Sequence, residues 1–254
     1  MSKFLLKISY DGTNYNGYQL QNDLPTVALM LNQASREAFG IECNVTGCSR
    51  TDSGVHALGF FVTVEPKSKD DEITVPVSKI PLVMNLKLPD DIAVLDAKEV
   101  NDDFHPRYDA ISKEYVYRIH DSLIPNPFYK NHVLEYGRRI TDEGIAKMNE
   151  ACKHFVGSHE FDSFMAAGSQ IKDTKRNVFY ASMERKGDIV EFTVCADGFL
   201  YNMVRIMVGT LLQVNSGRIS PNEIEHIIEA KDRSLAGFTA KAHGLYLKNV
   251  QYDS

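Results

Sequence analysis

The sequence predicts an α+β protein made of two pseudo-repeated β-α-β-β lobes. In the first half, a segment of alternating apolar residues is followed by helical spacing and then by two more strand-like segments, and the second half repeats this order. The 254 residues, 43% of them hydrophobic, suffice for one large domain or two smaller ones. We expect antiparallel sheets with helices on one face, and a central cleft between the lobes where a substrate binds.

The first lobe is expected to span residues 1–104. Polar and apolar residues alternate over residues 4–10, which predicts a strand. Thr26 is expected to cap the N-terminus of the helix that follows, and Gly40 to end it. Further elements are predicted at residues 43–49 (strand), 57–65 (strand), 66–74 (charged surface segment), 76–88 (short helix) and 91–100 (strand).

The second lobe is expected to span residues 105–254. Its predicted elements are a strand at residues 111–120, a helix capped by Thr141, a hairpin of residues 176–185 and 189–196, and a buried helix at residues 200–215. Arg205 lies within the apolar sequence of that last helix. A buried guanidinium is costly unless it meets a carboxylate, so Arg205 either serves an acidic group elsewhere or reaches the surface by its long stem.

Composition narrows the classes of function. No apolar run approaches the length of about 20 residues that spans a membrane, and the first ten residues do not resemble a signal peptide, so we expect a cytoplasmic protein with no membrane partner. The four cysteines lack the spacing of a zinc site and are expected to be reduced and packed. Because the net charge is -6, any RNA binding must depend on locally clustered basic residues.

A polar, glycine-containing segment at residues 47–56 lies between two apolar strands and presents Arg50, Asp52 and His56. Taken alone, Asp52 could be an ordinary turn residue. However, residues 50–57, Arg-Thr-Asp-Ser-Gly-Val-His-Ala, resemble the catalytic signature of the bacterial tRNA pseudouridine synthase A family. Further motifs of that family are matched in order at residues 10–19, 103–107, 113–117, 157–164, 202–209 and 244–247.

The resemblance covers almost the whole chain and implies the pseudouridine synthase fold. It also implies a homodimeric enzyme that isomerises uridine to pseudouridine at positions 38, 39 and 40 of the tRNA anticodon stem-loop, without a cofactor or a metal. By the same resemblance, Asp52 is the catalytic carboxylate and Tyr115 the active-site tyrosine, which stacks on the uracil and helps to remove the C5 proton. Arg205 is then the cation that keeps Asp52 ionised. The sequence leaves open whether Asp52 acts as a nucleophile or as a base on the sugar.

Several residues are expected to contact the RNA. Arg50 and His56 lie in the catalytic segment, and a mobile clamp is predicted over residues 168–177 with Lys172, Lys175 and Arg176. The chain departs from the family pattern at four positions, which are Tyr18 (usually tryptophan), Leu20 (usually arginine), Ser53 (usually alanine) and Lys241 (often proline). These departures bear on the RNA target rather than on the reaction.

Two other functions compete with this interpretation. Asp52-Ser53-Gly54 also matches the triplet of aspartic proteases, but the chain has no second copy and the residues before it are polar instead of apolar. A non-catalytic RNA-binding or RNA-chaperone module of the same fold would retain basic loops without the aspartate and the tyrosine. Both catalytic residue types are present here, which favours the enzyme.

Overall fold

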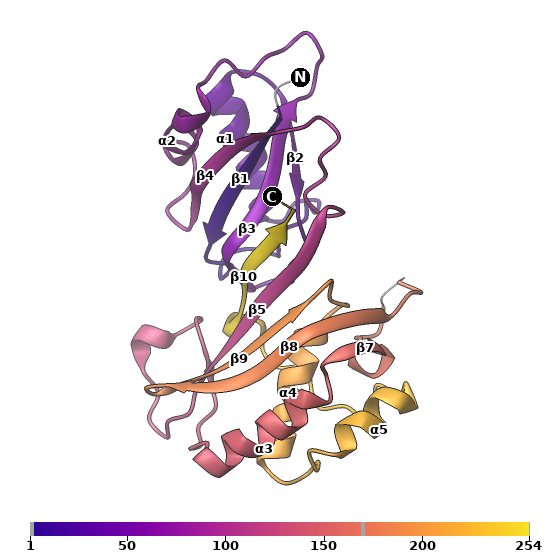
Figure 1. The fold of residues 1–254 in the computed structure, drawn as a ribbon. Coiled ribbons are helices and arrows are strands. Elements are labelled where there is room, and N and C mark those ends of the chain that lie inside the picture. Colours follow the sequence, from indigo (N-terminus) through magenta and orange to yellow (C-terminus); the bar gives the residue numbers. More distant parts are fainter. Residues whose placement is uncertain (1–2, 169–170, 254) are drawn as a thin grey trace. The chain divides into compact units, whose positions relative to one another are not determined.

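The chain forms two compact units in a computed structural model that describes residues 3–168 and 171–253 (Figure 1). Unit 1 comprises Met1–Ile111 and Tyr246–Ser254, and unit 2 comprises Ser112–Leu245. The expected lobes met between residues 104 and 105 and placed the C-terminus in the second lobe. In the structure the C-terminal strand returns to unit 1, because its main chain pairs with a strand there.

Unit 1 is a sheet with two helices. The strands are β1 (Lys3–Tyr10), β2 (Cys43–Gly47), β3 (His56–Pro66), β4 (Ile92–Val100) and β10 (Leu245–Tyr252). They follow the order β4-β1-β3-β10, and β2 also pairs with β3. The β1, β2 and β4 pairings are antiparallel as predicted, whereas β10 runs parallel to β3, with Tyr246 opposite His56.

Helix α1 (Val27–Phe39) begins and ends where the sequence predicts. The Thr26 side chain accepts a hydrogen bond from the Leu29 N–H, and Gly40 adopts a left-handed conformation with φ 71°. One face of α1 is buried in the core. The predicted short helix is α2 (Ile80–Asn85), which is preceded by a single 3-10 turn. The largest fully buried side chains of unit 1 are Leu5, Leu6, Ile8, Leu31, Phe60, Ile80 and Met84.

Unit 2 has a sheet in the order β5-β9-β8-β7, with the short β6 parallel to β5. Helices α3, α4 and α5 lie on one face of this sheet (Figure 1). The predicted hairpin is confirmed, as is the helix capped by Thr141, and β6, β7 and α5 are additional elements. The bounds are β5 Ala110–His120, β6 Leu134–Glu135, α3 Asp142–Lys153, β7 Gly157–Glu160, β8 Lys175–Lys186, β9 Ile189–Ala196, α4 Met203–Asn215 and α5 Glu223–Ala230.

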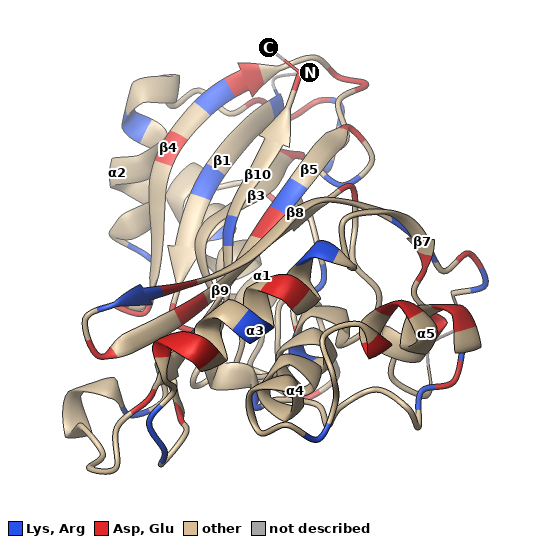
Figure 2. Ribbon diagram, turned by 60° about the horizontal axis from the view of Figure 1, so that its bottom comes forward, with Lys and Arg blue, Asp and Glu red and all other residues tan. Residues whose placement is uncertain are grey.

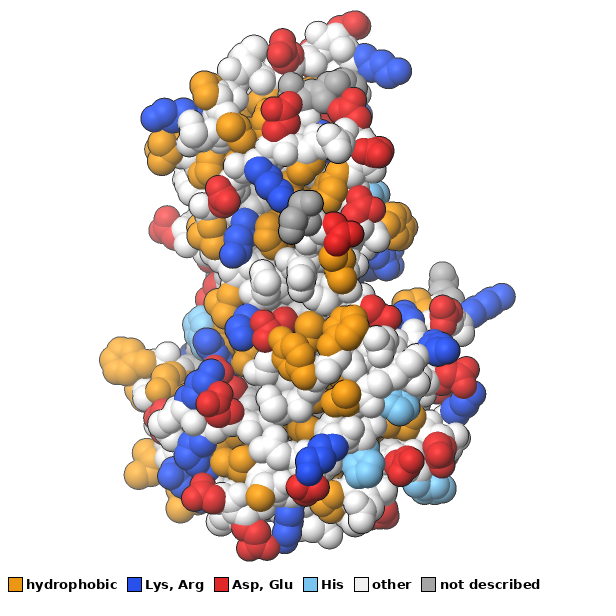
Figure 3. All heavy atoms as spheres, in the orientation of Figure 1, with side chains coloured by type: hydrophobic (Ala, Val, Ile, Leu, Met, Phe, Trp, Pro, Cys, Tyr) orange, Lys and Arg blue, Asp and Glu red, His pale blue; other side chains and the backbone are white. Residues whose placement is uncertain are grey.

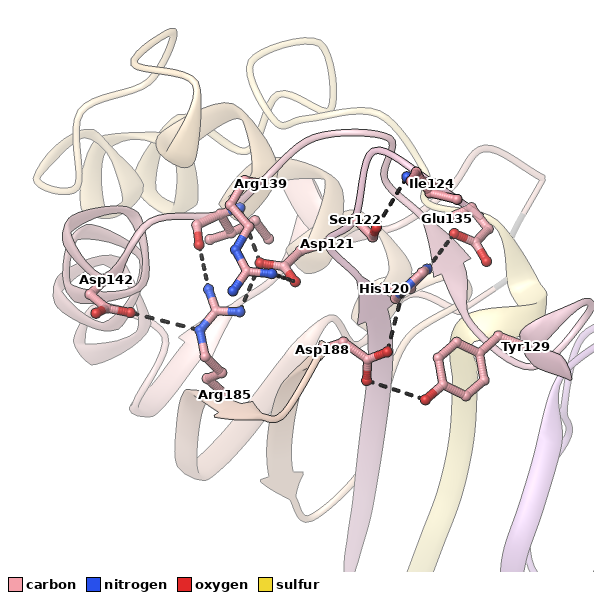
Figure 4. Close-up of polar contacts among 11 residues, drawn as sticks. His120, Asp121, Ser122, Ile124, Tyr129, Glu135, Arg139, Asp142, Arg185 and Asp188 are labelled. Atoms are coloured by element: carbon pink, nitrogen blue, oxygen red, sulfur yellow. Dashed lines mark hydrogen bonds and ion pairs between the residues drawn. The ribbon is translucent and has the colours of Figure 1, made fainter. Parts of the chain in front are cut away.

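A buried carboxylate joins three elements of unit 2 just after β5 (Figure 4). Asp121 is 0% exposed, and its Oδ2 lies 2.8 Å from Arg185 Nη1 and accepts a hydrogen bond from the Ile140 N–H. Its Oδ1 is 3.5 Å from Arg139 Nη1, and Arg185 also donates to the Ile140 carbonyl. The carboxylate therefore ties the end of β5 to β8 and to the residues that lead into α3.

Substitution of Asp121 by alanine should lower the free energy of unfolding by about 3–5 kcal/mol, because Arg185 would keep a partly buried charge without this partner. Glu150→Ala is the matched control, since Glu150 pairs with Lys153 on the exposed surface of α3. Urea unfolding followed by circular dichroism measures both variants, as the chain has no tryptophan. Equal losses in the two variants would contradict a structural role for the buried carboxylate.

Candidate active site

The predicted polar segment is a loop between β2 and β3 in unit 1. Within it Asp52 is half-buried and Arg50 is exposed, while Thr51 and Val55 point into the core. The Val55 N–H donates to the Asp52 carbonyl at 3.1 Å, and Gly54 adopts φ 76°, so a tight turn follows the aspartate. The loop thus presents one carboxylate and one guanidinium from a fixed backbone.

The backbone of residues 12–17 lies directly against this loop. A Cβ atom on Gly17, where φ is +83°, would lie 2.2 Å from the Thr51 carbonyl oxygen, and one on Gly12 would lie 2.0 Å from that of Val55. Hydrogen bonds follow from this approach: the Tyr18 N–H donates to Thr51 and the Gly54 N–H to Tyr15, each at 3.3 Å. The glycines are therefore needed for backbone contact on both sides of Asp52.

Two residues that depart from the family pattern, Tyr18 and Ser53, also contact the loop that carries Asp52 or the residues beside it. Tyr18 is buried, its ring stacks on Phe60 with centroids 4.5 Å apart, and it lies against Gly47, where a Cβ would come within 2.3 Å of the ring. The Ser53 hydroxyl donates to the Tyr15 carbonyl at 3.3 Å, a bond that alanine could not make. Both residues hold the loop in place.

His56 belongs to this support and does not fit the expected RNA contact. Its side chain is 1% exposed, and its ring stacks on Tyr246 at 4.6 Å. Its Nδ1 accepts the Gly12 N–H at 3.0 Å and lies 3.0 Å from an Asp11 carboxylate oxygen. The ring therefore ties the turn at Asp11 and Gly12 to the start of β3. RNA cannot reach a ring enclosed in this way.

Arg205 and Tyr115 lie in unit 2, on α4 and β5. Arg205 Nε donates to the Ala240 carbonyl and its Nη1 to Asn202 Oδ1, both at 2.6 Å. These two bonds orient the half-buried guanidinium. Tyr115 is buried, and its ring meets Phe199 edge-on at 5.1 Å.

Tyr117 lies close to Arg205 in the same unit. Burial raises the pKa of the Tyr117 hydroxyl, and the positive charge of Arg205 opposes that rise. The hydroxyl donates to the Lys241 carbonyl at 2.7 Å. Because a backbone carbonyl accepts this bond, lysine in place of the family's frequent proline leaves it intact.

The expected clamp over residues 168–177 is shorter than predicted. Lys175 and Arg176 belong to β8 and pair with Glu160 and His159 of β7, so they are strand residues and not part of a loop. Lys172 is exposed in the preceding segment, and residues 169–170 lie outside the described residues. The predicted hairpin strand, which started at residue 176, therefore begins at Lys175, and Arg176 lies in this strand instead of in the predicted clamp.

Charge is unevenly distributed on unit 2. Figure 2 shows acidic residues on α5, and Glu223, Glu225 and Glu229 of this helix are exposed. On the face seen in Figure 3, basic side chains are scattered among acidic and apolar ones, without a continuous basic field among the residues shown in colour. RNA phosphates would be repelled from α5, so a polynucleotide must use other surfaces.

Within the described residues, no group of three or more His, Cys, Asp or Glu side chains is arranged to hold a metal ion. The four cysteines are free and buried, as expected, and burial raises the pKa of the Cys43 thiol to about 11. The described helices include none with the length and apolar character needed to cross a bilayer.

Gly17→Ala should destabilise the protein more than Gly40→Ala. Both positions have positive φ, which costs alanine about 1–2 kcal/mol, but a Cβ at Gly40 meets nothing within 4 Å. At Gly17 the Thr51 backbone must move as well, which adds about 1–3 kcal/mol. Urea unfolding of the two variants tests this difference, and equal losses would show that the loop yields easily.

Comparison with known proteins assigns the family. The family model described as tRNA pseudouridine synthase matches residues 7–109 and 151–253. Proteins named tRNA pseudouridine synthase A from Clostridium kluyveri and Bacillus subtilis are 41% and 40% identical, covering 99% and 97% of this chain and 100% and 98% of their own lengths. A protein named tRNA pseudouridine synthase A 2, from Clostridium tetani, is 41% identical over 98% of both chains. The chain therefore belongs to the tRNA pseudouridine synthase family.

Proposed function

We propose that this chain isomerises uridine to pseudouridine in tRNA, with Asp52 as the catalytic carboxylate. The observation that carries the proposal is the loop of residues 47–56, which presents Asp52 from a backbone braced by Gly12 and Gly17. It does so in a chain that matches the family from end to end. A catalytic group must be held within a fraction of an ångström of its productive position, and this support supplies the needed rigidity.

The isomerisation of uridine requires an ionised carboxylate in the active site. The N1–C1′ bond of uridine breaks, the uracil turns, and C5 bonds to C1′ with loss of the C5 proton. Electrons and atoms balance without another substrate. Asp52 acts either by attacking C1′ or by removing a proton from the sugar, and both routes need an ionised carboxylate.

Arg205 and Tyr115 are the proposed partners of Asp52 in this chemistry. The Arg205 guanidinium is oriented by hydrogen bonds to the Ala240 carbonyl and to Asn202, and its positive charge is suited to stabilise an anionic carboxylate. Tyr115 is a ring that can stack on an extruded uracil, with a hydroxyl suited to help remove the C5 proton. Both roles come from the family resemblance, and the local geometry of unit 2 supports them.

The proposed substrate is the anticodon stem-loop of tRNA at positions 38, 39 and 40, and the proposed assembly is a cytoplasmic homodimer. RNA contacts are assigned to the exposed Arg50 and to Lys172, Lys175 and Arg176. The acidic surface of α5 supports a binding mode confined to such local basic groups. A sedimentation measurement that finds only monomers would remove the homodimer from this proposal.

Asp52→Asn should abolish isomerisation while leaving RNA binding intact. Tritium release from [5-3H]uridine-labelled tRNA should fall by at least about 100-fold, because the amide can neither attack nor accept a proton. Asp70→Asn, which changes an exposed aspartate in a surface turn of unit 1, is the matched control and should retain activity. If wild type binds several tRNAs but releases no tritium, a non-catalytic RNA-binding role replaces the proposal.

Tyr115→Phe should lower kcat by about 100-fold with little change in KM, because the ring remains and the hydroxyl is lost. Tyr115→Leu removes the ring as well and should also raise KM. Tyr180→Phe serves as control, since Tyr180 is an exposed tyrosine of β8 whose hydroxyl donates to Glu114. Normal kcat in Tyr115→Phe, with normal circular dichroism, would limit Tyr115 to a packing role.

A further inference from the structure

We infer that Tyr108, supported by His105 and accompanied by Arg107, forms a stacking site in unit 1 for an unpaired base of the substrate RNA. The inference rests on the proposed function and adds a binding subsite to it. Tyr108 is 77% exposed, although it lies in a hydrogen-bonded turn two residues before β5. An exposed aromatic ring on an ordered turn offers a face on which an unpaired base can stack.

The ring of Tyr108 is held from one side. Its centroid lies 4.3 Å from that of the His105 ring, with 34° between the two planes. His105 is itself fixed, because its Nδ1 accepts the backbone N–H groups of Arg107 and Tyr108 at 3.1 and 3.4 Å. One face of Tyr108 is thus occupied by a held imidazole, and the exposed surface of the ring is available to a base.

The turn beneath these rings is closed at both ends. The His105 N–H donates to the Asp109 carboxylate at 2.8 Å, and the Asp109 N–H donates to the His105 carbonyl at 3.1 Å. The backbone therefore needs little further ordering when a ligand binds. A site organised in advance loses less conformational entropy on binding than a flexible loop does.

Tyr252 links this turn to the loop that carries Asp52. Its hydroxyl donates to the Pro106 carbonyl at 2.7 Å and interacts with the Cys48 thiol, at the start of that loop. Phe61 and Phe104 pack on its ring, with centroids 5.3 and 5.2 Å away. Because one side chain touches both segments, the turn that carries Tyr108 is fixed relative to the loop that carries Asp52.

The chemistry of the turn selects a base instead of a phosphate. Arg107 is exposed, but Asp102, Asp103 and Asp109 surround it in sequence, so the segment has no net positive charge with which to attract the RNA backbone. Stacking needs no such charge, because every base has an apolar π-face. The affinity supplied by Tyr108 should accordingly depend little on salt, unlike that supplied by Arg50.

The first test compares turnover of tRNA by stacking variants. Tyr108→Ala should raise KM for tritium release by about 5- to 150-fold with kcat changed less than twofold, and Tyr108→Trp should restore a KM near that of wild type. Phe128→Ala is the matched control, since Phe128 is a 90% exposed aromatic residue in a surface turn of unit 2. An unchanged KM in Tyr108→Ala would overturn the inference.

The second test reads stacking directly. The chain has no tryptophan, so Tyr108→Trp in the Asp52→Asn background introduces a single fluorophore into a protein that does not turn over. Its emission should be quenched when an anticodon stem-loop RNA binds, at both low and high salt, whereas that of Phe128→Trp should stay constant. RNA binding without quenching would refute the stacking site and leave the proposed reaction untouched. Quenching together with no tritium release by wild type would refute the reaction alone.

Discussion

The contact between two stretches of backbone, residues 12–17 and 51–55, is the constraint on which unit 1 depends. Any side chain at Gly12 or Gly17 would occupy the space of a carbonyl oxygen in the loop. The remaining features of the loop follow from this approach: hydrogen bonds run from main chain to main chain, His56 is enclosed, and Tyr18 fills the space beside Gly47. Asp52 is positioned by glycines as much as by its own neighbours.

Unit 2 has a similar glycine-dependent backbone contact next to Arg205. A Cβ on Gly209 of α4 would lie 1.7 Å from the Phe238 carbonyl oxygen, so the helix and residues 237–238 also meet backbone to backbone. The Ala240 N–H donates to the Arg205 carbonyl, and the Ala240 carbonyl accepts from the Arg205 side chain. Each of the two charged groups assigned to catalysis therefore rests on a glycine-permitted contact that a flexible loop could not reproduce.

The net charge of -6 is compatible with an RNA substrate because the proposed contacts do not depend on a broad basic field. Arg50 is the proposed charged contact next to Asp52, and Tyr108 is the proposed stacking contact in a segment whose neighbours are acidic. Stacking and a few guanidinium groups recognise single-stranded bases with less dependence on salt than a long basic surface would show.

Elements whose signals are local can be predicted from the amino-acid sequence. The caps at Thr26, Gly40 and Thr141, the β8–β9 hairpin and the loop carrying Asp52 all depend on residues a few positions apart, and the structure has them where they were predicted. Tertiary contacts alone place the C-terminal strand in unit 1, pair β7 with the start of β8, enclose His56 and leave Tyr108 exposed. These features depend on contacts between segments that are far apart in the chain. The free energy of the whole fold decides which segments pair, and no local sequence periodicity indicates that choice.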